Sequence, residues 1–140
     1  FYSNELVAFC MNNATILKVG SEELPIVEDL LSIDRSVGYK EFARILREKY
    51  GNLKIIVITL GADGAYCYDC KQDKAYSCES QKVEEASTVG AGDSFCAAFL
   101  TRYMKTKDIN AALALATNIS GFVVSCKDAI PQYELSDLDI

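Results

Sequence analysis

The sequence predicts an α/β domain of three layers, with helices on both faces of a mainly parallel sheet. Residues Lys54–Thr59 are apolar on both strand faces, which is typical of a buried central strand. Short apolar runs alternate with longer stretches of helical periodicity along the chain. Two short tyrosine-containing segments, 65–68 and 75–78, flank the polar turn 69–74 and add a small antiparallel extension.

Three helices and one strand are expected before the central strand, at residues 2–12, 15–19, 24–31 and 37–50. Ser3 or Asn4 is suited to cap the first helix, and Ser21 to cap the second. Pro25 falls in the first turn of that second helix, where its missing N–H costs little.

Beyond the central strand, Gly61–Gly64 forms a turn and two further helices are predicted at 93–105 and 108–125. Gly121 lies inside the last helix, where we expect it to allow close packing. The segment 131–140 is expected to be peripheral. Loops that follow strands in such sheets lie along one edge, where ligands bind, so the unusual loops should lie near one another.

Composition excludes several classes of function. The chain has 140 residues, half of them hydrophobic, and a net charge of −6 without a basic run. Nucleic acid and anionic membrane surfaces are therefore not expected partners. Its apolar runs are too short and interrupted to span a bilayer. The N-terminal residues lack the basic region and cleavage site of a secretory leader, so we expect a cytoplasmic protein.

The chain has six cysteines and no histidine. A mixed Cys/His zinc site and a Ser-His-Asp hydrolase are therefore excluded. Cys67 and Cys70 form a single C-x-x-C inside the predicted hairpin. Reduced thiols are favoured there, and a metal or redox role remains the alternative.

The stretch Ser87–Phe95 carries the chemistry that distinguishes this chain. Its Gly-Ala-Gly turn lets the backbone approach a ligand, and a helix starting there would point unpaired N–H groups outward. Those groups and the helix dipole favour an anion. Asp93 would repel a phosphate, but it makes sense as the base that takes a proton from an attacking hydroxyl. The alternative is an ordinary Gly-rich helix start with an acid near the cap.

This stretch, followed by Ala97-Ala98-Phe99-Leu100, resembles the second signature of the ribokinase/PfkB family of sugar and nucleoside kinases. The residue pattern of this stretch, Thr88-Val89-Gly-Ala-Gly-Asp-Ser-Phe, is similar to the pattern in fructokinase-like members of the family. Residues 16–24 look like the family's N-x-x-E segment, in which Glu23 matches the Glu and Gly20 replaces the usual Asn. The turn Gly61–Gly64 after its strand resembles the nucleotide-side G-x-x-G turn.

The resemblance implies roles for individual residues. Asp93 would be the catalytic base, and the backbone N–H groups of Gly90, Ala91 and Gly92 would form an anion hole. Glu23 would support Mg²⁺, directly or through water. The residues implied at the nucleotide are Thr59, Gly61, Gly64, Thr88 and Asn118. Those implied at a monovalent cation such as K⁺ are Ser87, Val89 and Ser125, although Ser87 replaces a frequent Asp and Asp128 a common Gly.

The implied function is ATP-dependent phosphorylation of a sugar hydroxyl, with Mg²⁺ as cofactor. Family members are longer, and their N-terminal half carries the sugar-binding residues, so residues 1–140 resemble the C-terminal ATP-binding and catalytic part alone. We therefore expect a fragment that is inactive by itself, with a homodimer of the complete protein left open. The alternatives are a nucleoside kinase of the same family and a non-catalytic nucleotide-binding or interaction module. A Rossmann-type dinucleotide domain is disfavoured, because no G-x-G-x-x-G follows the strand that ends at Val19 or the strand that ends at Thr59.

Overall fold

The computed structural model describes residues 3–128, 131, 132 and 134, so most of the predicted peripheral segment lies outside the described residues. The helices are α1 (Asn4–Asn13), α2 (Leu24–Leu31), α3 (Tyr39–Lys49), the short 3-10 helix η1 (Gly61–Asp63), α4 (Ala91–Thr106) and α5 (Ile109–Val124). The strands are β1 (Ile16–Gly20), β2 (Ile55–Thr59), β3 (Ala65–Asp69) and β4 (Lys74–Cys78). Each predicted helix and strand is present, with ends that differ by a few residues.

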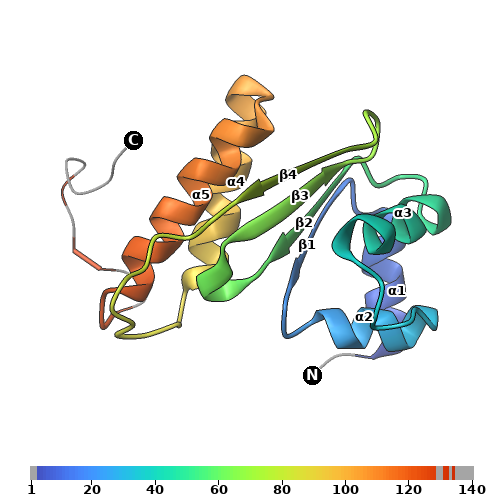
Figure 1. Ribbon diagram of the computed structural model, residues 1–140, viewed down its shortest axis with the longest axis horizontal. Coiled ribbons are helices and arrows are strands. Elements are labelled where there is room, and N and C mark those ends of the chain that lie inside the picture. Colours follow the sequence, from blue (N-terminus) through green and yellow to red (C-terminus); the bar gives the residue numbers. More distant parts are fainter. Residues whose placement is uncertain (1–2, 129–130, 133, 135–140) are drawn as a thin grey trace. The chain divides into compact units, whose positions relative to one another are not determined.

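The four strands form one mixed sheet in the order β1-β2-β3-β4 (Figure 1). Strands β1 and β2 are parallel, and Gly20 at the end of β1 pairs with Thr59 at the end of β2. The links from β2 to β3 and from β3 to β4 are too short for the crossover that parallel strands need. The hairpin β3–β4 is therefore the antiparallel extension that the sequence predicts.

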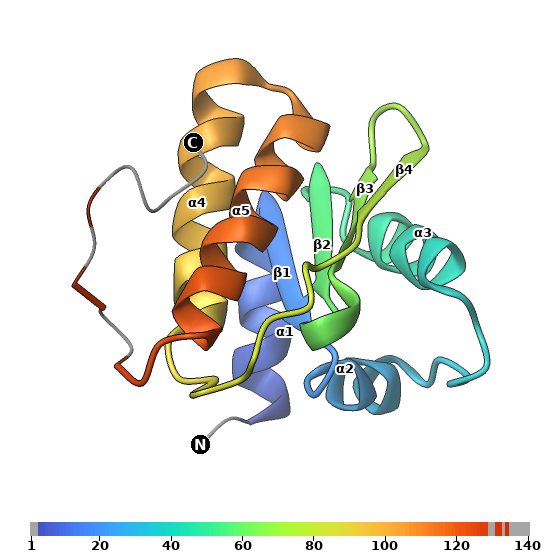
Figure 2. The same cartoon turned by 60° about the vertical axis from the view of Figure 1, so that its left-hand side comes forward.

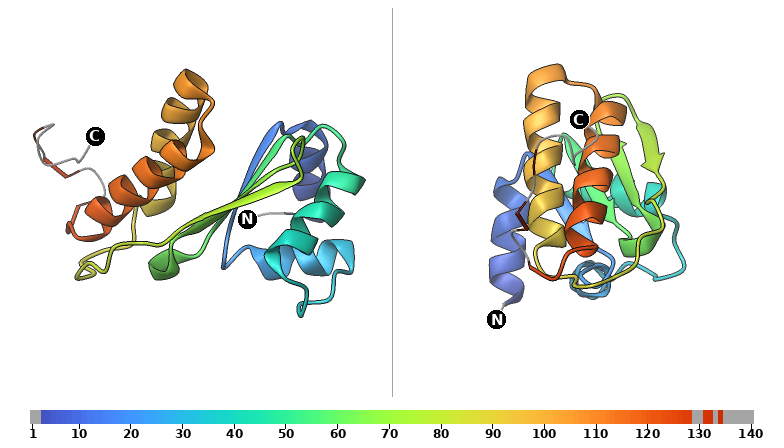
Figure 3. Two further views of the ribbon diagram at one scale, coloured as in Figure 1. Left: turned by 45° about the horizontal axis from the view of Figure 1, so that its top comes forward. Right: turned by 90° about the vertical axis from the view of Figure 1, so that its left-hand side faces the viewer.

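The chain divides into two compact units, and the first comprises residues 1–59 and 66–75. In this unit α1, α2 and α3 lie on the same side of β1 and β2 (Figures 1 and 3). Four consecutive residues of β2 are buried, as predicted for a central strand. The core side chains of the unit include Met11, Val27, Phe42, Leu46, Ile55, Ile56, Val57 and Ile58.

Two capping predictions have different outcomes. The Ser3 side chain accepts a hydrogen bond from the Leu6 N–H and caps α1, as expected. Ser21 does not cap α2, because that helix begins three residues later with Glu23 at its N-cap. The Ser21 N–H instead donates to the Thr59 carbonyl at 2.8 Å, which ties the ends of β1 and β2 together.

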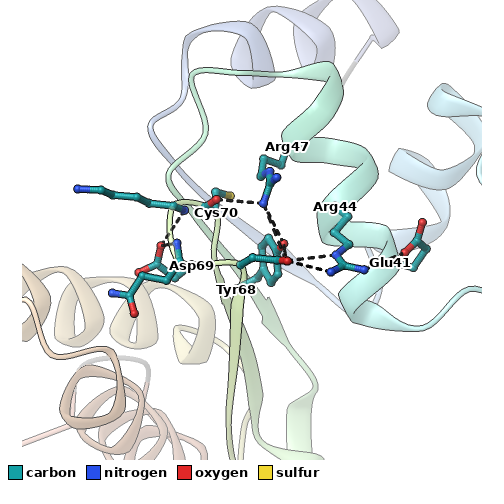
Figure 4. A network of polar contacts seen from close by, with 9 residues as sticks. Glu41, Arg44, Arg47, Tyr68, Asp69 and Cys70 are labelled. Carbon is teal, nitrogen blue, oxygen red and sulfur yellow. Dashed lines mark hydrogen bonds and ion pairs between the residues drawn. The ribbon is translucent and has the colours of Figure 1, made fainter.

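A polar network fastens the β3–β4 turn to α3 (Figure 4). Arg44 donates from Nε and Nη2 to the two carboxylate oxygens of Asp73 at 3.2 and 2.9 Å. The Tyr68 hydroxyl donates to the same carboxylate. Arg47 donates to the Tyr68 hydroxyl and, at 3.1 Å, to the Cys70 carbonyl. Because the guanidinium of Arg44 and the hydroxyl of Tyr68 stabilise the charged form, the pKa of Asp73 lies well below its usual value.

This network gives stability a defined dependence on pH. Since the folded-state pKa of Asp73 is lowered, its contribution is complete above the unfolded value of 3.8 and is lost as the pH falls through the folded value. The Asp73→Asn variant should therefore unfold at lower urea concentration than the unaltered chain at pH 7, and this gap should shrink below pH 3.8. Urea unfolding over a pH series measures it. The control Glu48→Gln, which removes an exposed carboxylate of α3, should change little.

The six cysteines are free thiols. Burial raises the pKa of Cys67 to about 12 and that of Cys70 to about 11. These two thiols therefore stay protonated at neutral pH, which suits packing residues better than nucleophiles or metal ligands. Among the described residues, no group of three or more His, Cys, Asp or Glu side chains could hold a metal ion.

The second unit comprises residues 60–65 and 76–140, and within it α4 and α5 pack side by side (Figure 2). They are joined only by Lys107 and Asp108, and the Asp108 side chain accepts from the Ala111 N–H to cap α5. The apolar side chains buried in this unit include Phe95, Phe99, Ile109, Leu113, Ala116 and Val123. Among the described residues, no helix has both the length and the apolar character needed to cross a bilayer.

One glycine prediction is wrong. A Cβ built at Gly121 would meet no atom within 4 Å, so this glycine does not serve close packing. Helix α5 runs through position 121 without a break.

Candidate functional site

The Gly90-Ala91-Gly92 turn, which we call the anion turn, runs directly into α4, and this helix begins at Ala91, two residues earlier than expected. Gly90 is the N-cap residue and has φ 84°, a left-handed conformation that glycine adopts without the strain of a side chain. Asp93 is consequently the third residue of the helix rather than its first. The carboxylate therefore lies within the same helical turn as the N–H groups that start the helix.

The N–H groups of this turn are largely unpaired. The Ala91 N–H donates to the Thr88 carbonyl at 3.2 Å. Within the described part of the chain, the N–H groups of Gly90, Gly92 and Asp93 have no acceptor, and no side chain caps the helix. Unpaired donors at the positive end of a sixteen-residue helix attract an anion.

The Asp93 side chain is exposed, and its carboxylate forms no hydrogen bond or ion pair with any described residue. It is therefore free to accept a proton from a bound hydroxyl. The Ala91 carbonyl, two residues before Asp93, accepts hydrogen bonds from two hydroxyls, that of Ser94 at 2.9 Å and that of Ser120 of α5 at 3.2 Å. Sequence reasoning missed both serines, and only the position of Ser94 three residues after Ala91 could have indicated the first.

The loop before the turn is fastened to the end of α5. The N–H groups of Ala86 and Ser87 both donate to the Val124 carbonyl, at 2.9 and 3.1 Å. The Ser87 hydroxyl accepts from the Val89 N–H at 3.3 Å. These bonds bring Ser87 near Ser125, two of the residues predicted for a monovalent cation. The hydroxyl of Ser125 is engaged with the Phe122 carbonyl at 2.7 Å, so the cation role remains a prediction.

The predicted nucleotide residues on the second unit lie in three places, and one of them, Thr88, lies next to the anion turn, where its carbonyl accepts the Ala91 N–H. Asn118 is half-buried in the middle of α5, next to Thr117, whose buried hydroxyl has no hydrogen-bond partner among the described residues. The Gly61–Gly64 turn is closed by a hydrogen bond from the Leu60 N–H to the Gly64 carbonyl at 2.8 Å. Both glycines have positive φ, 59° and 99°, as a tight turn after a strand requires.

A second cluster occupies the ends of β1 and β2 in the first unit. Glu23 folds back toward β1, so that its Oε2 accepts the Gly20 N–H at 2.6 Å and lies 3.5 Å from the Lys18 ammonium. The Glu23 N–H donates to the Gly20 carbonyl at 2.9 Å. Position 20 is close to three side chains, since a Cβ there would lie 3.3 Å from Glu23 Oε2 and 3.7 Å from both Lys18 Nζ and Thr59 Oγ1. The structure thus gathers Gly20, Glu23 and Thr59 into this strand-end cluster and Ser87 to Asp93 around the anion turn, whereas Asn118 and the Gly61–Gly64 turn belong to neither group.

Solved structures with a similar fold include sugar kinases and a nucleoside kinase by name. The 2-dehydro-3-deoxygluconokinase of Thermotoga maritima has a TM-score of 0.77 at 19% identity, covering 97% of this chain and 43% of that one. The fructokinase of Vibrio cholerae, solved with fructose, ADP and calcium, has a TM-score of 0.72 at 23% identity, covering 90% and 40%. The chain therefore has the ribokinase-like α/β fold, present as a partial domain.

The family follows from the sequence comparison. The model of the pfkB family carbohydrate kinases matches residues 4–135, so the chain belongs to this family. A curated relative, the 5-dehydro-2-deoxygluconokinase of Halalkalibacterium halodurans, is 36% identical over 84 residues. That alignment covers 58% of this chain and 25% of the relative, so the matched segment is about a quarter of the relative's length.

Proposed function

We propose that this chain is the ATP-binding and catalytic part of a kinase that phosphorylates a sugar hydroxyl. One observation carries the proposal, the start of α4, where unpaired N–H groups of Gly90 and Gly92 share a turn with the unpartnered carboxylate of Asp93. Donors for a phosphate beside an acceptor for a proton are what phosphoryl transfer to an alcohol needs. A module that only binds an anion has no use for the carboxylate.

In the proposed reaction, Asp93 accepts the proton of the sugar hydroxyl while its oxygen attacks the γ-phosphorus and the bond to ADP breaks. The N–H groups of Gly90 and Gly92 stabilise the negative charge that develops on the transferred group. Thr59, the Gly61–Gly64 turn and Asn118 are proposed to border the nucleotide. These proposed roles come from the family resemblance and are assigned to residues whose positions are described above.

Magnesium is a proposed cofactor, and Glu23 fits a supporting role. Its Oε2 is held by the Gly20 N–H, while Oε1 has no partner among the described residues and can face a metal or its water. Mg²⁺ is commonly held by one or two carboxylates together with substrate phosphates, and there it neutralises phosphate charge. A monovalent cation at Ser87, Val89 and Ser125 is a further proposal.

The proposed substrate is a sugar acid of the 5-dehydro-2-deoxygluconate type, supported by the name of the curated relative at 36% identity. Fructose is the second candidate, because the residue pattern of the anion turn resembles that of fructokinase-like members. Since ATP and reduced thiols are found in the cytoplasm, we propose that location. A homodimer of the complete protein is a prediction that light scattering would check.

Calorimetry of the 140-residue chain with ATP, with and without Mg²⁺, tests the nucleotide site. We expect binding that strengthens with Mg²⁺ and persists in Asp93→Asn, because the carboxylate is reserved for chemistry. The control Glu85→Gln removes an exposed carboxylate of the preceding loop and should bind as the unaltered chain does. Absence of ATP binding under all of these conditions would contradict the proposed function of this chain.

A further inference from the structure

The carbonyl of Ala91, inside the anion turn, is held by side chains from two helices. Ser94, three residues further along α4, donates to it from its hydroxyl at 2.9 Å, and Ser120 of α5 does so at 3.2 Å. Both serines are partly buried, and both lie in the second unit together with the anion turn. At the N-terminus of a helix the N–H groups lack partners, whereas the carbonyls do not. Two hydroxyls on this carbonyl are therefore more than the start of a helix requires.

The hydroxyl of Ser120 bonds across the helix pair rather than within its own helix. A serine or threonine hydroxyl in a helix commonly donates to the carbonyl three or four residues earlier in the same helix. The hydroxyls of Ser94, Thr106 and Ser125 follow this pattern. That of Ser120 instead reaches α4, 29 residues away in sequence. Its bond therefore fixes the first turn of α4 against α5.

The carbonyl that these serines hold belongs to the same peptide unit as the Gly92 N–H. A trans peptide is planar, so its C=O and N–H point in opposite directions and fixing one fixes the other. The Gly92 N–H is at the open end of α4 and has no acceptor among the described residues. Hydrogen bonds to the carbonyl also polarise the peptide, because hydrogen bonds in a chain strengthen one another. The two hydroxyls therefore both aim the Gly92 N–H and make it a stronger donor.

We propose that Ser120 is a positioning residue for phosphoryl transfer, which acts through the Ala91–Gly92 peptide and keeps the Gly92 N–H aimed at the transferred group. The inference rests on the proposed function and deepens it, because it gives a side chain of α5 a part in the anion turn. The Gly92 N–H stabilises charge that develops in the transition state. A donor that is no longer aimed therefore lowers kcat more than it weakens the binding of ATP.

Sugar-dependent release of ADP, in a protein that carries this chain together with a sugar-binding half, measures the effect. Ser120→Ala should lower kcat by about 5- to 50-fold, which is less than the roughly 10²–10³-fold cost of removing such a donor outright. The KM for ATP should change little, as expected for an interaction that matters in the transition state. Ser120→Thr keeps the hydroxyl and should retain most of kcat. The control Thr101→Ala removes an exposed hydroxyl of α4 and should leave both constants unchanged.

Nuclear magnetic resonance of the 140-residue chain observes the peptide itself, without ligand or activity. Ser120→Ala should shift the resonances of the Ala91 carbonyl carbon and the Gly92 amide, because the carbonyl loses one of its two hydroxyl donors. Ser120→Thr should bring both resonances back toward those of the unaltered chain, and Thr101→Ala should not move them. The unfolding temperatures of the same variants show whether the fold is preserved.

The outcomes separate this inference from the proposed function. Unchanged kcat in Ser120→Ala, or Gly92 resonances that do not move, would overturn the role of Ser120 and leave the kinase proposal standing. Equal losses in Ser120→Ala and Ser120→Thr, with a lower unfolding temperature and a higher KM for ATP, would show that Ser120 is structural and would also overturn it. If the unaltered protein released no ADP with any sugar, both proposals would fall.

Discussion

The Asp93→Asn variant is expected to lose about 10²–10⁴-fold in the rate of phosphoryl transfer, or roughly 3–5 kcal/mol of transition-state stabilisation. The amide has nearly the shape of the carboxylate but cannot accept the proton of the attacking hydroxyl. The exposed position of Asp93 in the first turn of α4 means that the fold should be unaffected. Sugar-dependent release of ADP measures the rate, in a protein that carries this chain together with a sugar-binding half.

The interpretation depends on ATP binding being retained, which calorimetry on the same variant checks. The control Glu85→Gln makes the same chemical change in the loop that precedes the anion turn, and its rate should match that of the unaltered protein. Near-normal turnover of Asp93→Asn would remove Asp93 from the role of base.

The Gly64→Ala variant is expected to lose on the order of 3–5 kcal/mol in the free energy of unfolding. Gly64 has φ 99° and ψ −133°, a region that side chains rarely enter. A Cβ there would lie 2.0 Å from the carbonyl oxygen of Cys78 and 2.8 Å from the N–H nitrogen of Ser80. Both obstacles are backbone, so relief requires the segment after β4 to move away from the turn. Urea unfolding followed by circular dichroism measures the loss.

Gly61→Ala provides the matched control, since Gly61 also has positive φ but a Cβ there would meet no atom within 4 Å. Its cost should be only the left-handed strain, about 1–2 kcal/mol. Equal small losses in the free energy of unfolding in Gly64→Ala and Gly61→Ala would mean that the backbone at Cys78–Ser80 can move away from the turn at little energetic cost.

The sequence was sufficient to predict the order of helices and strands, because their signals are local. The uninterrupted apolar run of β2 and the Ser3 cap of α1 are examples. The start of α4 was less predictable, since Gly90-Ala91-Gly92 has weak helix propensity and the helix there is stabilised by contacts from elsewhere. The cap of α2 was wrongly assigned because the helix begins at Leu24, three residues after Ser21, with Glu23 at its N-cap.

For the candidate site, the sequence indicated the backbone turn and Asp93 but not their surroundings. Ser120 lies 29 residues from the Ala91 carbonyl that it contacts, and no local spacing signals such a bond. The Lys18–Glu23 pair likewise depends on how the chain leaves β1 and on the absence of a side chain at Gly20. Contacts between residues distant in sequence are decided by packing, which a single sequence does not reveal.

The hydrogen bonds that two positions of α5 make with the anion turn and the loop before it have a consequence for tolerance to insertion and deletion. Ser120 holds the Ala91 carbonyl, and the Val124 carbonyl one turn later holds the N–H groups of Ala86 and Ser87. One residue inserted or deleted between these two points would rotate one contact by about 100° relative to the other. The segment 120–124 should therefore keep a constant length wherever this turn is functional, whereas length changes in the short α4–α5 connection could be absorbed before α5 begins.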